Sequence, residues 1–251
     1  MLSYSPLTLP ADRLFFDEET KKFYDKTTGD EVSGWNLADG YTVYAQISKG
    51  GSCFAYRGLH EGRFVIVKEL IPASFCPFLT RREDGSIVFD DELSYSHSYL
   101  SKIKEKINNA YQHEIDMSHR LRYKGSNNDP RFFSVNEIPT SSASLAKYLA
   151  IDTSAGDTLD TYVLNHPQYQ PHSPKYDIVA CLNLAKEVAY AIGEIHAKGF
   201  LHLDVKPSNL FRSELAYMQH GASLIHPIDM GSAVAMLHSG HIDESTVLYG
   251  S

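Results

Sequence analysis

The chain has 251 residues and is 43% hydrophobic, enough to bury the core of one large domain or of two lobes around a cleft. Its 31 acidic residues outnumber its 23 basic ones, so the formal net charge is −8 and no basic run offers nucleic acid a phosphate-binding stripe. The three cysteines are widely spaced, which favours a reduced, cytoplasmic setting over a disulfide framework. The sequence shows no signal-peptide pattern and no apolar run of about 18 residues, so this segment is not expected to contact a membrane.

Residues 1–40 are expected to form a small N-terminal β-hairpin extension. Aromatic pairs alternate with polar, turn-forming clusters in FFDEETK (15–21) and FYDKTTG (23–29), a pattern typical of short strands. Two or three short strands are marginally stable alone, so we expect the hairpin to cap a neighbouring sheet. A docking module is the functional alternative.

Residues 41–153 are expected to form a strand-rich first lobe. Two β-rich runs, 41–58 and 62–70, are separated by a glycine-containing turn and predict consecutive antiparallel strands. Residues 71–98 are rich in Pro, Asp and Ser and lack a clear period, which indicates an insert or long loop. A further strand is predicted over 145–153.

A helix is predicted from about Tyr99, where the apolar period becomes helical. Glu114 lies on its apolar face, and a carboxylate there is costly to bury unless a cation meets it. We therefore expect Glu114 to face a basic group. The apolar residues on this face are Leu100, Ile103, Ile107, Ala110 and Leu121.

Residues 154–251 are expected to form a mainly helical rear portion. A long helix is predicted over 174–198, with Ser173 as its N-cap, Pro174 at its first position and Gly199 just after its end. The residues predicted to face inward are Ile178, Cys181, Leu182, Ala185, Val188, Ile192 and Ile195.

Two polar motifs follow this helix on loops: HLDVKPSN at 202–209 and IDMGSA at 228–233. With the order of elements before them, they resemble a eukaryotic-type (Hanks-type) Ser/Thr protein kinase over roughly residues 41–251. A polar capping turn is the structural alternative for the first motif. The resemblance implies an α+β, bilobal fold: an antiparallel, β-rich first lobe with one regulatory helix, and a mainly helical second lobe that is incomplete here. It also implies transfer of the γ-phosphate of ATP to hydroxyl groups of a protein substrate.

The resemblance assigns roles to four residues of these motifs. Asp204 would accept the substrate hydroxyl proton and orient the hydroxyl, and Lys206 would neutralise charge near the transferring phosphate. Asn209 and Asp229 would bind Mg²⁺ through an amide and a carboxylate oxygen. Methionine at 230, where the family has phenylalanine, keeps an apolar side chain beside the metal ligand.

By the same resemblance, Lys68 would hold the α- and β-phosphates of ATP and Glu114 would pair with it. A lysine that ends an apolar strand is more often a solvent-facing cap, but an inward carboxylate on the next helix favours the phosphate role. The two residues are 46 positions apart in the sequence, which we attribute to the insert at 71–98.

ISKGGSCFAY (47–56) aligns with the glycine-rich loop of the family, although Ser48 and Cys53 stand at its first and third glycine positions. Backbone amides can still cover phosphates, because only the tight middle of the turn needs glycine. Ile151 would lie at the back of the adenine pocket, followed by a hinge at 152–154. The nucleotide-binding residues implied are Ile47, Gly50, Gly51, Cys53, Lys68, Ile151, Asp152 and Ser154.

Two departures concern regulation and extent. Leu203 replaces the arginine that pairs with a phosphorylated activation loop in many family members, so ordering of that loop by this route is not expected. STVLYGS (245–251) resembles the stretch before the substrate-binding loop, which favours a fragment of a longer kinase; a minimal kinase that closes its rear lobe differently is the alternative.

Two other functions stay open. A pseudokinase scaffold is favoured by Ser48 and Cys53, and opposed by the retained lysine, aspartates and asparagine of the motifs. A small-molecule phosphotransferase is the second alternative. That family shares the HxD…N pattern but typically lacks a Lys-Pro pair like Lys206-Pro207 of this chain. HSGH (238–241) with Asp243 lacks further ligands at suitable spacing and predicts a solvated loop and not a metal site.

Overall fold

The computed structural model describes residues 9, 13–49, 53–71, 79–82, 86–89, 96–123, 132–142, 144–153, 156–213 and 225–236. The chain divides into two compact units. Unit 1 takes Met1–Gln112 and Val135–Asp152, and unit 2 takes His113–Ser134 and Thr153–Ser251. Helix α1 (His97–Tyr123) contributes its first part to unit 1 and its last part to unit 2.

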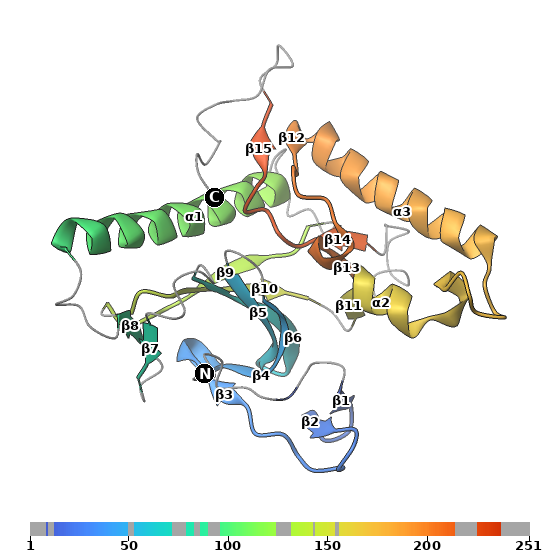
Figure 1. Ribbon diagram of the computed structural model, residues 1–251, viewed down its shortest axis with the longest axis horizontal. Helices are drawn as coiled ribbons and strands as arrows, with labels where there is room; N and C mark the ends of the chain where they lie inside the picture. Colours follow the sequence, from blue (N-terminus) through green and yellow to red (C-terminus); the bar gives the residue numbers. More distant parts are fainter. Residues whose placement is uncertain are drawn as a thin grey trace. The chain divides into compact units, whose positions relative to one another are not determined.

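Unit 1 is built on a six-stranded sheet in the order β3-β4-β5-β6-β10-β9, in which every neighbouring pair is antiparallel (Figure 1). The predicted glycine-containing turn joins β5 to β6 through Glu61 and Gly62, which both have positive φ (50° and 72°), as tight hairpin turns require. The strands are β3 (Trp35–Asn36), β4 (Tyr41–Lys49), β5 (Cys53–His60), β6 (Arg63–Leu70), β10 (Lys147–Asp152) and β9 (Val135–Ile138).

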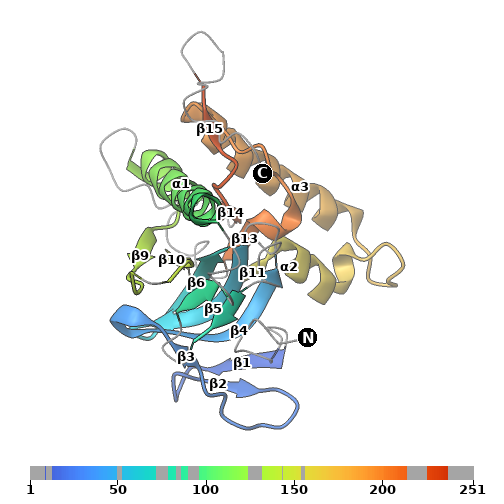
Figure 2. The ribbon, with the colours of Figure 1, turned by 60° about the vertical axis from the view of Figure 1, so that its left-hand side comes forward.

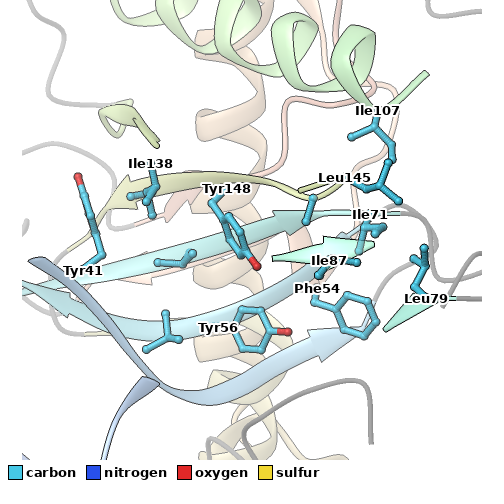
Figure 3. Close-up of a cluster of buried hydrophobic side chains, with 14 of the residues drawn as sticks. Tyr41, Phe54, Tyr56, Ile71, Leu79, Ile87, Ile107, Ile138, Leu145 and Tyr148 are labelled. Atoms are coloured by element: carbon cyan, nitrogen blue, oxygen red, sulfur yellow. The ribbon is translucent and has the colours of Figure 1, made fainter. Parts of the chain in front are cut away.

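One face of this sheet carries the main core of unit 1 (Figure 3). Val65 and Val67 of β6 point to it, and Leu100, Ile103 and Ile107 of α1 belong to the same cluster. They are three of the five residues predicted to face inward; Leu121 is also buried and Ala110 is partly buried, so the helical period is confirmed. The first part of α1 is held by apolar burial.

Two small hairpins add to unit 1. β1 (Leu14–Asp17) pairs with β2 (Lys22–Asp25), and Phe23 of this hairpin is buried in one cluster with Ala45 and Leu59 of the sheet. In the predicted insert, β7 (Leu79–Arg81) pairs with β8 (Ile87–Phe89).

A buried polar network joins the insert hairpin to the sheet. The Glu69 carboxylate on β6 has no exposed surface and accepts two hydrogen bonds from the Arg81 guanidinium, at 2.7 and 2.9 Å. The hydroxyl groups of Tyr56 and Tyr148 also donate to Glu69. The pKa of the Tyr148 hydroxyl is raised well above its usual value, because burial and the adjacent Glu69 charge both disfavour the phenolate.

Unit 2 contains two further helices, α2 (Leu159–Asn165) and α3 (Ile178–Ala197), shown in Figure 2. Its strands form a three-stranded sheet, β11-β13-β14, and a two-stranded pair, β12 with β15. Short 3₁₀ turns precede α3 at Pro167–Tyr169 and follow β12 at Pro207–Asn209. The strands are β11 (Gly156–Thr158), β12 (Phe200–Leu201), β13 (Leu210–Ser213), β14 (Ile225–Pro227) and β15 (Val234–Ala235).

The predicted start of the long helix was wrong by one turn. Asp177 is the N-cap of α3, and its carboxylate accepts from the backbone N–H groups of Val179 and Ala180. Ser173 instead accepts from Lys175 N–H in a turn before the helix. The predicted end is confirmed, since Gly199 follows α3 with φ 78°.

The predicted inward face of α3 is also only partly correct. The most buried residues are Leu184, Ala191 and Ile195, whereas Ile178 and Leu182 are exposed. An apolar period shows which residues share a face of a helix, but not which parts of the apolar surface are covered. None of the described helices is long and apolar enough to cross a membrane.

Candidate active site

The loop after β12 holds three of the predicted site residues in one hydrogen-bonded group. Asn209 Nδ2 donates to the backbone oxygen of Asp204 at 3.0 Å and to Asp204 Oδ2 at 2.8 Å. Lys206 Nζ donates to the same carboxylate oxygen at 2.8 Å. Asn209 is 5% exposed, while about half of the Lys206 side chain and two fifths of the Asp204 side chain face solvent, at 50% and 41%. The loop therefore exposes the Asp204 carboxylate and the Lys206 ammonium group to solvent, while the buried side-chain amide of Asn209 holds the Asp204 carboxylate in place.

His202 and Leu203 shape the start of this loop. His202 is 1% exposed, and its Nδ1 atom accepts from Asp204 N–H at 3.3 Å. Leu203 has φ 61°, a conformation that is strained for a branched residue, and its side chain is exposed. The turn at Leu203 separates the buried histidine from the accessible aspartate.

A backbone hydrogen bond holds the second motif (228–233) beside the first (202–209). Ile228 N–H donates to the carbonyl oxygen of Asn209 at 3.1 Å, which places Asp229 next to Asn209. Asp229 Oδ1 accepts from Gly231 N–H at 3.2 Å, and Met230 is buried. The methionine thus fills the apolar position that the sequence predicted.

Glu114 of α1 reaches the same segment. It is 2% exposed, and a Cβ atom added at Gly231 would lie 3.7 Å from Glu114 Oε2 and 3.2 Å from Asp229 Oδ1. A side chain at 231 would therefore crowd the Asp229 carboxylate and touch that of Glu114. Within unit 2, Glu114 and Asp229 thus lie around Gly231, and the backbone hydrogen bond from Ile228 N–H to the Asn209 oxygen brings Asn209 close to Asp229.

A contact that the sequence did not predict lies one residue before Glu114. The ring nitrogen Nε2 of His113 is 2.9 Å from the carbonyl oxygen of Ala233, four residues after Asp229. Burial lowers the pKa of His113, and the Ala233 carbonyl and Asp116 oppose that effect. A histidine next to the predicted glutamate was the only sign in the sequence, because its partner is 120 residues away.

In unit 1, the strand register gathers three of the predicted nucleotide-binding residues on one sheet face. Cys53 pairs with Leu70 and Ile151 pairs with Ile66, the residues two positions on either side of Lys68. Cross-strand partners and alternate residues share a face, so Cys53, Ile151 and Lys68 lie on the face opposite the main core. Lys68 is 4% exposed, and therefore is not the solvent-facing cap that a strand-ending lysine usually is.

The positions of the other predicted nucleotide-binding residues do not indicate a shared site. Ile47 lies at a register irregularity between Gln46 and Ser48, and Asp152 accepts from Asn136 Nδ2 at 3.0 Å. Gly50, Gly51 and Ser154 lie outside the described residues, as do residues 238–251 with the HSGH stretch.

The donor set beside Asp204 fits a hard cation. Both hydrogen bonds of the Asn209 side chain within the described part of the chain use its nitrogen, and its amide oxygen makes no hydrogen bond with another described residue. Amide and carboxylate oxygens are the ligands that Mg²⁺ prefers, and Mg²⁺ usually keeps other positions for water and phosphate. No group of three or more His, Cys, Asp or Glu side chains among the described residues is placed to hold a metal alone. Asn209 and Asp229 would thus form a partial site that a phosphate ligand completes.

Comparisons with known proteins support the fold. No family model matches the chain. The sequence is 25% identical over 164 residues to eukaryotic translation initiation factor 2-alpha kinase 3 of Bos taurus, which covers 57% of this chain and 14% of that protein. The solved structure described as "PpkA-294 apo form" superposes with a TM-score of 0.54 at 22% identity, covering 80% of this chain and 61% of that one. The chain thus spans a small part of the first protein and under two thirds of the second, and it has a partial protein-kinase-like α+β fold.

Proposed function

We propose that this chain is the catalytic part of an ATP- and Mg²⁺-dependent protein kinase that phosphorylates serine or threonine hydroxyl groups. The observation that carries the proposal is the hydrogen-bonded group formed by Asp204, Lys206 and Asn209. Phosphoryl transfer passes through a loose transition state, so its catalyst must position groups and neutralise charge more than form covalent bonds. A carboxylate, an ammonium group and a buried amide on one loop supply those needs.

Asp204 is suited to orient the substrate hydroxyl. Its Oδ2 atom accepts from Lys206 and Asn209, whereas its Oδ1 atom makes no hydrogen bond with another residue in the described part of the chain. The carboxylate is thus fixed by one oxygen and can accept the hydroxyl proton with the other. Lys206 would place its positive charge beside the phosphate that is transferred.

Asn209 and Asp229 would hold Mg²⁺, which supplies neutralisation of the charge on the ATP phosphates. Gly231 supports this role, because its N–H group fixes one oxygen of Asp229. In unit 1, Lys68 would bind phosphate oxygens, and its buried position on β6 is compatible with that role.

Specificity for serine and threonine rests on Lys206, which stands two residues after Asp204 as in Ser/Thr kinases. A cytoplasmic location is part of the proposal. The three cysteines are odd in number, widely spaced and without a CxxC pair, which is typical of proteins in a reducing compartment.

The direct test is the Asp204→Asn variant of the full-length protein that contains this chain. The amide keeps the shape but removes the charge that orients the hydroxyl, so phosphorylation of a Ser/Thr peptide mixture should fall by about 10²–10⁴-fold. Nucleotide binding, measured as the rise in melting temperature with Mg²⁺·ATP, should change little. Asp160→Asn, an exposed carboxylate on α2 in the same unit, is the matched control and should keep full activity.

Two outcomes would contradict the proposal. Equal turnover in the Asp204→Asn variant and the wild type would remove Asp204 from the chemistry. If the folded wild-type protein shows neither a Mg²⁺-dependent shift with ATP nor any transfer, the kinase function itself fails.

A further inference from the structure

The hydrogen bond between His113 and Ala233 joins α1 to the segment that follows Asp229. A carbonyl oxygen can only accept, so His113 Nε2 carries the proton and donates it at 2.9 Å. His113 is partly buried and Ala233 is fully buried, so this bond is shielded from competing water. Its loss would leave a buried backbone oxygen without this donor.

Both partners adjoin residues of the candidate active site. His113 precedes Glu114 on the helix, and Ala233 closes a turn in which its N–H group donates to the Met230 oxygen at 3.0 Å. Between Asp229 and Ala233 lies Gly231, close to the carboxylates of both Asp229 and Glu114. The bond therefore fixes one end of a five-residue segment, 229–233, whose other end carries the metal ligand.

Apolar contacts also stabilise this junction. Met117, one turn after His113 on α1, is buried in one cluster with Met230 and Ala233. Apolar burial stabilises such a junction but is non-directional, and methionine adapts its shape to several arrangements. A hydrogen bond with a required distance and angle fixes the register that the apolar contacts leave adjustable.

We propose that His113 is a positioning residue that sets residues 229–233 along α1, so that Asp229 and Glu114 keep the geometry required for Mg²⁺ and phosphate binding. The catalytic part of this inference rests on the proposed kinase function, whereas the structural part does not. Small displacements of reacting groups, of about 1 Å, can lower a rate by roughly 10²-fold. An anchor at this junction can therefore affect turnover without touching the substrate.

The structural part is tested by amide hydrogen exchange, which needs no activity. His113→Ala removes the donor, while His113→Gln places an amide N–H group near the position of Nε2. We expect faster exchange at residues 231–236 in the alanine variant and near wild-type exchange in the glutamine variant. Gln112→Ala, an exposed neighbour on the same helix, controls for a general effect on α1 and should leave exchange unchanged. Equal exchange in all four proteins, or equal acceleration in both His113 variants, would overturn the anchor.

The catalytic part is tested by the Mg²⁺ dependence of peptide phosphorylation in the full-length protein. His113→Ala should lower kcat by about tenfold to a hundredfold and raise the Mg²⁺ concentration needed for half-maximal rate, because Asp229 is less well placed. In the His113→Gln variant, kcat and the Mg²⁺ concentration for half-maximal rate should both be close to the wild-type values. An active wild type with an alanine variant of unchanged Mg²⁺ dependence would overturn the inference alone. An inactive wild type with the expected exchange pattern would instead overturn the proposed function and leave the anchor supported.

Discussion

Helices α1 and α3 are the two long helices of the described chain, and they use their apolar residues differently. In α1 the large apolar residues predicted at helical spacing are buried, from Leu100 to Leu121, and the small residue Ala110 is partly buried. In α3, Ile178 and Leu182 keep more than half of their surface exposed, at 55% and 63%, although they fit the helical period equally well. The comparison teaches that an apolar period locates a helix, whereas the neighbouring elements decide how much of its surface is covered.

The largest expected contrast comes from truncating one apolar side chain on each helix. Ile107→Ala removes a side chain that is 3% exposed in the core of unit 1, and should lower the free energy of unfolding by about 2–5 kcal/mol. Leu182→Ala removes an exposed side chain and should change it by about 0.5 kcal/mol or less. Urea unfolding of both variants measures the difference. Similar losses would mean that the exposed part of α3 is covered in solution.

A smaller effect is expected at the start of α3. Asp177→Ala removes the carboxylate that accepts from Val179 and Ala180 N–H groups, and should lower the free energy of unfolding by about 1 kcal/mol. Ser173→Ala is the control, because that residue caps only a turn before the helix. A larger loss from Ser173→Ala than from Asp177→Ala would restore the helix start that the sequence predicted.

The smallest effect on stability is expected from Leu182→Glu. A glutamate at this exposed position should alter the free energy of unfolding by about 0.5 kcal/mol or less. It should nevertheless reduce binding of a hydrophobic dye and self-association, because it interrupts an exposed apolar surface with Ile178 and Val179. Dye fluorescence and sedimentation at several concentrations measure this. Unchanged dye binding would place the apolar surface elsewhere.

The sequence predicted best what short spacing determines. Asp204, Lys206 and Asn209 share one loop, so their mutual contacts follow from a motif of six residues. The burial of Glu114 followed from helical periodicity, and the strand pairing around Lys68 from two β-rich runs and a turn. The α+β, kinase-like class was therefore predictable and is confirmed by the structural similarity to a solved chain.

Other features depend on contacts between distant parts of the chain. His113 and Ala233 are 120 positions apart, and neither residue type predicts that the two form a hydrogen bond. The start of α3 was predicted wrongly because Ser173 is as suitable an N-cap residue type as Asp177, so residue type alone does not locate the first turn. The roles of Lys68, Asp204, Asn209 and Asp229 stay predictions, since no ligand or activity tests them.

The buried ion pair between Glu69 of β6 and Arg81 of β7 makes the stability of the sheet depend on the insert hairpin. Removing the hairpin would delete Arg81 and leave the Glu69 carboxylate buried without its cation, a change that typically costs about 3–5 kcal/mol. The two positions can therefore change only together, for example to two apolar residues of similar volume. An apparently dispensable insertion is in this way a fixed component of unit 1, and shortened versions of the protein are expected to fold only if position 69 is redesigned as well.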